Sequence, residues 1–259
     1  MGKIATKSTQ VLLGLLGIII TVFPCEAYFN LPPLPTADKY GDVVMDQCAT
    51  AQGQKAVVFS HWSHRTRFSC RVCHFELDFA FVAGQSDINE EDMLDGDFCG
   101  ACHDGSQAFG VTKQNCEKCH TGNDIDRSKQ FAQLQDKLWK LPQGQYGNNI
   151  NWTLAQQQGL IDPKYSMFRP QEKPLAFAKA LVLDAEWSWV SPAVFNHDTH
   201  TPWLDCANCH PSIFNIKKKT TKHFRMVYIL EKKFCGVCHF AVSLPIDDCS
   251  ACHPDMRKH

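Results

Sequence analysis

The chain has 259 residues, of which 44% are hydrophobic, enough to bury one large core or two modest ones. With 26 basic and 27 acidic side chains the protein is almost neutral, so its bulk charge indicates neither a nucleic acid nor an anionic membrane as a partner. Fourteen cysteines are far above the usual content, and their spacing decides which class of protein they indicate.

The first 27 residues have the layout of a secretory signal peptide. Lys3 and Lys7 precede an apolar run over Val11–Phe23, and Ala27 offers a cleavage site. The run has 13 residues, which is short of the roughly 20 that a transmembrane helix needs. We therefore expect a periplasmic or extracellular protein. An uncleaved membrane anchor and a lipid on Cys25 are the alternatives.

Residues 28–55 are rich in proline, aspartate and glycine, which predicts an extended N-terminal arm. The arm holds Cys48, which has no partner left once Cys25 is removed with the signal peptide. We expect Cys48 to be a buried free thiol, and an intermolecular disulfide is the alternative.

The most informative segment is residues 59–74, with the sequence FSHWSHRTRFSCRVCH. Its last five residues form a CxxCH motif, the attachment signature of haem c. Each cysteine of such a motif forms a thioether to a haem vinyl group, and the adjacent histidine becomes the proximal ligand of the iron. The same pattern returns 136 residues later in residues 195–210, FNHDTHTPWLDCANCH. The chain is therefore a duplication of haem-binding units.

Twelve of the fourteen cysteines fall into six CxxCH motifs. Disulfide frameworks and zinc sites also use CxxC pairs, but neither explains a histidine directly after every pair. We therefore expect six covalently bound haem c groups. The attachment cysteines are Cys70, Cys73, Cys99, Cys102, Cys116, Cys119, Cys206, Cys209, Cys235, Cys238, Cys249 and Cys252. The proximal ligands are His74, His103, His120, His210, His239 and His253.

Six irons take up to twelve axial ligands, so the proximal histidines leave six ligands to be found. His61, His64, His197 and His200 are the candidate distal ligands, because each pair lies at the same distance before the first motif of its repeat. Two histidines saturate an iron, which favours electron transfer over the binding of small molecules.

One haem in each repeat still lacks a distal ligand. Met93 lies six positions before Cys99, and Met226 lies nine positions before Cys235, each on an expected helix. Methionine sulfur is a soft ligand that raises the reduction potential relative to a second histidine. The alternatives are that the methionines pack on a porphyrin face, or that His223 is the ligand in the second repeat.

The sequence predicts five segments: a signal peptide (1–27), an extended arm (28–55), a first three-haem module (56–122), a connector (123–189) and a second module (190–259). The first module opens with a short β segment, Val57–Phe59, and the density of ligands leaves little room for long helices. Apolar spacing in the connector predicts short helices over Phe131–Trp139 and Trp152–Leu160. The expected fold is mainly α-helical with much irregular coil.

These motifs resemble those of the triheme cytochrome c7 domains of the cytochrome c3 superfamily. The resemblance is carried by Phe59-x-His61-x-x-His64 before Cys70, by Phe98-Cys99-Gly100-x-Cys102-His103 followed by Ala108-Phe109, and by the parallel set within residues 195–253. It implies a class III cytochrome c fold in which packed haems form the core of two triheme modules joined by a partly helical connector.

The resemblance also implies a pairing of ligands, in which the first histidine of each pair binds the first haem and the second histidine binds the second haem. The implied pairs are His61 with His74, His64 with His103, His197 with His210, and His200 with His239. The third haem of such domains takes a histidine or a methionine, which maps onto Met93 and Met226 at unequal offsets.

We therefore expect an exported electron-transfer protein, not an enzyme, that relays electrons between redox partners such as other cytochromes or a quinol-linked membrane complex. Self-association in a larger complex stays open, and no nucleic acid is expected as a partner. One alternative is a reductase of a small oxyanion or metal ion at the haem of His120 or His253. Another is a haem-bearing subunit of a membrane complex or of a conductive filament. The basic run Lys217–Lys219 is either a solvated face or a docking site for an acidic partner.

Overall fold

The computed structural model describes residues 31, 33–123, 125–137, 141–185, 190–217 and 225–256. The expected signal peptide, His223, Lys218 and Lys219 lie outside these ranges. No helix within them is long and apolar enough to cross a membrane. Residues 34–259 cluster into a single unit, which holds both expected haem modules and the connector.

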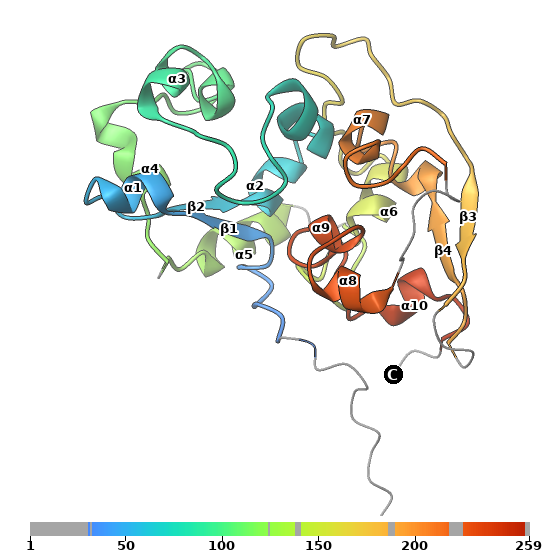
Figure 1. Cartoon of the computed structure of the whole chain (residues 1–259). Helices are drawn as coiled ribbons and strands as arrows, with labels where there is room; N and C mark the ends of the chain where they lie inside the picture. The colour runs from blue at the N-terminus through green and yellow to red at the C-terminus, as the bar shows by residue number, and fades with distance from the viewer. Residues whose placement is uncertain are drawn as a thin grey trace, which may run out of the picture. The chain divides into compact units, whose positions relative to one another are not determined.

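Each repeat begins with a two-stranded antiparallel sheet, which Figure 1 shows as two separate pairs of arrows. The strands are β1 (Asp42–Met45) with β2 (Val57–Ser60), and β3 (Ala180–Leu183) with β4 (Ala193–Asn196). The expected β segment at the start of the first module is confirmed as β2. Its partner strand comes from the segment expected to be an arm, and β3 likewise comes from the expected connector. The sequence did not predict these partner strands.

The helical segments are short, between three and ten residues in the described part of the chain. The first repeat contains α1 (Gln47–Ala51), α2 (His61–Arg65), η1 (Val72–Glu76), α3 (Glu90–Leu94), η2 (Phe98–Ala101), η3 (Lys113–Asn115) and α4 (Cys116–Cys119). The second contains η4 (His197–Thr199), α7 (Cys206–Cys209), α8 (Met226–Leu230), α9 (Gly236–His239) and α10 (Cys249–Cys252). The expectation of many small helices separated by coil is confirmed.

The connector forms both helices that its apolar spacing predicts. They are α5 (Ser128–Lys137), which begins three residues earlier than expected, and α6 (Trp152–Gln157), which ends three residues earlier. Asn151 caps α6, because its side-chain oxygen accepts a hydrogen bond from the backbone N–H of Leu154 at 3.0 Å. The two helices of the connector are therefore part of the fold.

The main apolar core is built around the connector and not within either module. Its buried members are Trp62, Phe131, Leu141, Ile150, Ala155, Ile161 and Trp203. Only Trp62 comes from the first module and only Trp203 from the second; the other five belong to the connector. The rings of Trp62 and Phe131 meet edge to face at 5.2 Å, and the Trp62 indole N–H donates to the Asp38 carbonyl oxygen at 2.9 Å.

The connector also holds the turn that precedes β1. The buried Asn148 side chain donates to the carbonyl oxygens of Ala37, at 2.7 Å, and of Tyr40, at 2.9 Å. Gly147 has a φ of +64° and lies so close to the Tyr40 ring that an added Cβ would be 3.0 Å from it. The Tyr40 hydroxyl in turn donates to the Ser243 carbonyl oxygen in the second module, at 2.6 Å. Connector and modules therefore share one network of contacts.

Two glycines allow a helix to pack directly on a CxxCH motif. An added Cβ on Gly100 would lie 1.8 Å from the Met93 carbonyl oxygen of α3, and one on Gly236 would lie 2.0 Å from the Ile229 carbonyl oxygen of α8. The same motif position holds arginine, glutamate, alanine or serine in the other four motifs. Glycine is therefore needed here for the close approach of backbones and not for haem attachment.

Cys48 is exposed, so the expectation of a buried thiol is wrong. The residue lies in α1, which buries none of its side chains. Its sulfur lies 4.0 Å from a carboxylate oxygen of Asp87.

Substitution of Phe131 by alanine tests whether the connector contributes to stability. We expect Phe131→Ala to lower the free energy of unfolding by about 3–5 kcal/mol, since it removes a buried aromatic ring from the core. The measurement is guanidinium unfolding of the haem-loaded protein, followed by tryptophan fluorescence. Gln130→Ala, at an exposed position of the same helix, is the matched control and should change the value by less than about 0.5 kcal/mol. Equal effects of the two changes would mean that the connector is not part of the core.

Substitution of Gly100 by alanine tests the contact between α3 and η2. We expect Gly100→Ala to destabilise α3 and η2 strongly, because the new methyl group would overlap the Met93 carbonyl oxygen. The methyl group is fixed to one backbone and the carbonyl belongs to another, so no side-chain rotation can relieve the overlap. Thermal unfolding and limited proteolysis of the purified protein would report this loss. Ala207→Gly, at the same position of the fourth motif, is the control and should have a small effect. Normal proteolytic resistance of the Gly100→Ala protein would contradict the expectation.

Candidate haem-binding sites

Each of the six CxxCH motifs lies on a short helical turn. The turns that carry them are η1, η2, α4, α7, α9 and α10. Residues three and four apart lie on one face of such a turn, so both cysteines and the histidine of a motif can face the same porphyrin. None of the twelve motif cysteines is in a disulfide. Within each motif, the two free cysteines and the histidine therefore lie close together on one short turn.

All six proximal histidines are oriented by the same kind of hydrogen bond. In each, ring Nδ1 lies 2.6–3.0 Å from a backbone carbonyl oxygen. The carbonyls belong to Phe79, Phe109, Lys55, Phe214, Leu244 and Ser191, in the order of the motifs. A carbonyl oxygen can only accept, so Nδ1 carries the proton and Nε2 keeps its lone pair for a metal ion.

The four candidate distal histidines follow the same rule. His61 and His197 point Nδ1 at the carbonyl oxygens that precede β1 and β3, at 2.7 Å in each case. His64 and His200 point Nδ1 at the carbonyl oxygens of the last residues of β2 and β4, at 3.1 and 2.8 Å. The two repeats therefore hold equivalent histidines by equivalent carbonyl groups, and each sheet positions both members of its pair.

Burial keeps these imidazoles neutral. It lowers the pKa of His61 to about 3 and that of His200 to about 4. Burial also lowers the pKa of His64, His74 and His239 below the usual value for histidine. A neutral imidazole is the form that binds a metal ion, so near neutral pH these side chains need not lose a proton first.

Three of the four expected ligand pairs face each other across a gap of the right width for an iron. The ring centroids are 6.4 Å apart for His61 and His74, 6.3 Å for His64 and His103, and 6.0 Å for His200 and His239. With metal–nitrogen bonds of about 2 Å on each side, two opposed imidazoles have centroids about 6 Å apart. The residues present therefore fit haem iron.

Phenylalanines beside the distal pairs restrict how these rings can turn. The Phe59 ring lies 4.8 Å from the His61 ring and 4.6 Å from the His64 ring. Phe195 repeats the arrangement in the second repeat, 4.8 Å from His197 and 4.4 Å from His200. The phenylalanine that opens each quoted sequence segment thus packs on both histidines that follow it.

The remaining haems are less complete within the described residues. No ring contact joins His197 to His210, and none places an imidazole opposite His120 or His253 in that part of the chain. Met93 and Met226 both lie on helices, as expected, but at different places: Ile229, and not Met226, occupies the position of Met93 over its glycine. The role of the two methionines as ligands stays a prediction.

One residue near a motif was not found by sequence reasoning. The Met167 sulfur lies 3.8 Å from the Cys102 sulfur of the second motif, although 65 residues separate them. Met167 belongs to the connector, where no spacing relates it to a motif. Only the fold brings it to this place.

Comparisons with known proteins identify the family of the chain. The sequence model of "Cytochrome c7 and related cytochrome c" matches residues 57–121 and 193–254. A solved c7-type three-haem cytochrome domain is 34% identical over 34% of this chain and 94% of its own, with a TM-score of 0.27. The C-terminal hexahaem fragment of GSU1996 is 26% identical over 86% of this chain and 98% of its own, also with a TM-score of 0.27.

The dodecahaem cytochrome c GSU1996 is 22% identical over 82% of this chain and 73% of its own, with a TM-score of 0.27. No curated protein sequence matches the chain. With TM-scores this low, the assignment rests on the sequence matches and the motifs. Two matched segments that each hold three CxxCH motifs show that the chain belongs to the cytochrome c7 family, as a multihaem cytochrome c with tandem c7 domains and covalent haem c as its cofactor.

Proposed function

We propose that the protein is an exported hexahaem cytochrome that relays electrons between redox partners. The observation that carries the proposal is the set of three histidine pairs whose ring centroids lie 6.0–6.4 Å apart. Such pairs leave no open coordination position on an iron, which favours electron transfer over substrate binding. Bound haem supplies reversible one-electron chemistry, and the protein supplies axial ligands, cover and local charge.

The proposed modules extend further toward the N-terminus than the sequence motifs alone. His61 depends on a carbonyl oxygen directly before β1, and His197 depends on one directly before β3. We therefore count β1 with the first module and β3 with the second. The remaining connector, with α5 and α6, provides the apolar core between them.

The proposed location of the relay rests on the sequence, and its redox partners are part of the proposal. The layout of residues 1–27 supports export to the periplasm or beyond. Redox proteins such as other cytochromes, or a quinol-linked membrane complex, are the proposed electron donors and acceptors.

A reductase is the second candidate function, and one observation favours it. His120 and His253 are oriented by carbonyl oxygens like the other proximal histidines, yet no described imidazole faces either ring. Unlike His210, for which His197 is the proposed distal ligand, these two have no histidine proposed opposite them. They are therefore the positions where an open or weakly held sixth coordination site would allow a small oxyanion or metal ion to react.

The proposed assignment of His61 to the first haem and of His64 to the second can be tested directly. His64→Ala should convert the haem of Cys99 and Cys102 to a high-spin form, because His64 faces His103. His61→Ala should instead affect the haem of Cys70 and Cys73. Haem methyl resonances assigned by NMR give the spin state of each haem separately. Mass spectrometry should show six attached haems in both variants, and an exchange of the two effects would contradict the pairing.

Binding of carbon monoxide to the reduced native protein separates the two candidate functions. For an electron relay with all irons saturated, we expect no change in the visible spectrum at neutral pH. The His64→Ala variant is the positive control, since it opens one site and should bind one equivalent. Stoichiometric binding by the unmodified protein would instead support a reductase at the haem of His120 or His253.

A further inference from the structure

A fully buried arginine lies inside the first haem attachment motif. Arg71 is the residue between Cys70 and Val72, and its side chain is 1% exposed. A buried guanidinium is costly unless its charge is paired and its N–H groups are hydrogen-bonded. The groups that bind its guanidinium therefore indicate its role.

The guanidinium of Arg71 binds three carboxylates from three parts of the chain. It contacts Glu76 in η1, Glu172 in the connector with Nη2 to Oε1 at 3.3 Å, and Asp205 in the second module with Nε to Oδ2 at 3.1 Å. It also donates to the Tyr165 carbonyl oxygen at 3.2 Å, and it lies 4.8 Å from the centre of the Tyr165 ring. One side chain thus joins the first module, the connector and the second module.

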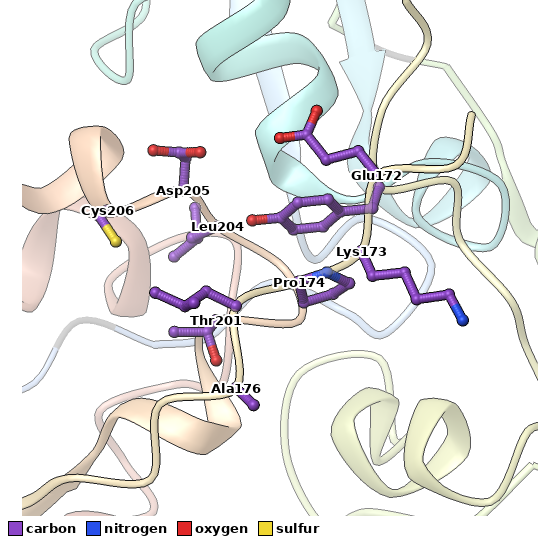
Figure 2. A pocket seen from close by; sticks show the side chains of 10 residues that line it. Glu172, Lys173, Pro174, Ala176, Thr201, Leu204, Asp205 and Cys206 are labelled. Atoms are coloured by element: carbon purple, nitrogen blue, oxygen red, sulfur yellow. The ribbon is translucent and has the colours of Figure 1, made fainter. Parts of the chain in front are cut away.

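Asp205 links this cluster to the fourth attachment motif. It precedes Cys206 and caps α7, since its Oδ1 accepts from the Ala207 backbone N–H at 3.0 Å while its Oδ2 faces Arg71. Figure 2 shows Glu172, Asp205 and Cys206 around one cavity of about 410 Å³. Two of the three carboxylates that bind Arg71 therefore border the fourth motif.

Backbone contacts join the two attachment turns beside the ion cluster. The Arg71 N–H donates to the Trp203 carbonyl oxygen at 2.8 Å, and the buried Asn208 side chain donates to the His74 carbonyl oxygen at 2.9 Å. Asn208 also closes the capping box of α7 with Asp205. Turn η1 of the first haem and helix α7 of the fourth are consequently fixed against each other.

A further contact joins the first module to the segment after the fifth motif. The Arg65 side chain of the first module donates to the Val242 carbonyl oxygen of the second, at 2.8 Å. Val242 follows His239 by three residues, so the end of the fifth motif also lies against the first module.

Arg71 is not required for haem attachment as such. The corresponding position of the fourth motif is Ala207, 136 residues later, and the position that corresponds to Glu76 is Ser212. The fourth motif thus has no arginine of its own at this position and contributes to the cluster only through Asp205. The arginine stands in the first motif, where the two modules meet.

We propose that Arg71 is a positioning residue that holds the attachment turns of the first and fourth haems together, so that electrons cross between the modules at this junction. The proposal rests on the proposed function and specifies it. Each crossing moves one electron from a ferrous to a ferric iron, and no bond is made or broken. The junction joins the first motif of each repeat, so the relay does not follow the order of motifs in the sequence.

Two conservative variants test this role. Arg71→Lys keeps the positive charge but replaces the planar guanidinium, whose several N–H groups can bind several carboxylates at once, by a single ammonium group. Asp205→Asn removes the ion pair but keeps the helix cap, since asparagine caps a helix as well as aspartate does. Arg127→Lys is the matched control, because Arg127 is mostly buried and pairs with Asp42 of β1 at 3.2 Å, so it joins the connector to the first module and not to the second.

The first measurement is exchange NMR of the partially reduced protein, in which the haem methyl resonances report electron exchange between individual haems. We expect exchange between the first and fourth haems to slow several-fold in Arg71→Lys and in Asp205→Asn. Exchange between the first and second haems should not change, and Arg127→Lys should match the unmodified protein. If Arg71→Lys fails to accumulate, Asp205→Asn decides the question.

The second measurement is amide hydrogen exchange, which does not depend on electron transfer. Arg71→Lys should increase exchange in residues 203–210, far away in the sequence, and Arg127→Lys should not. Unchanged electron and hydrogen exchange in both junction variants would overturn the proposal, as would equal changes in the control. Absence of electron exchange between any haems of the unmodified protein would instead refute the proposed function itself.

Discussion

The structure depends on one repeated interaction, the hydrogen bond from histidine Nδ1 to a backbone carbonyl oxygen. All ten histidines proposed as iron ligands make it, whether they follow a cysteine pair or a β strand. The bond fixes the tautomer and the plane of each ring, so Nε2 of each histidine is available in a set direction. Since the acceptors are backbone groups, the path of the chain itself sets the ligand geometry.

This dependence explains why strands and a connector are needed in a protein with so little regular structure. The sheets exist to place the carbonyl groups and the paired histidines that follow β2 and β4. They are too short to be stable alone, since isolated two-stranded sheets are marginal in water. The apolar core around α5 and α6 supplies protein stability between the modules, where Trp62 and Trp203 extend from either side. Ligand placement and core formation are thus assigned to different segments.

Features encoded by residues close together in the sequence, such as the motifs and the short helices, were predictable. The hydrogen-bond and ion-pair partners that come from distant residues were not. Motif spacing predicted the attachment cysteines and the candidate histidines, and apolar spacing predicted α5 and α6, because these signals lie within a few residues of each other. The carbonyl acceptors of His61 and His197 carry no such signal, since any residue type has a carbonyl group. Nothing in the sequence of the first motif marks Arg71, and only the fold brings Asp205, 134 residues away, into contact with it.

The two repeats share most of their structural features, so a residue that differs between them indicates a role specific to one repeat. Sheets, histidine hydrogen bonds and the glycine contacts recur in both copies, as expected for features that each copy needs to hold its own haems. Arg71 has alanine as its counterpart, so it serves something that a single copy does not have. A buried cation between three carboxylates costs desolvation energy that an apolar residue would avoid. Such a cost is consistent with a role in fixing the relative position of two modules, which apolar packing alone specifies less sharply.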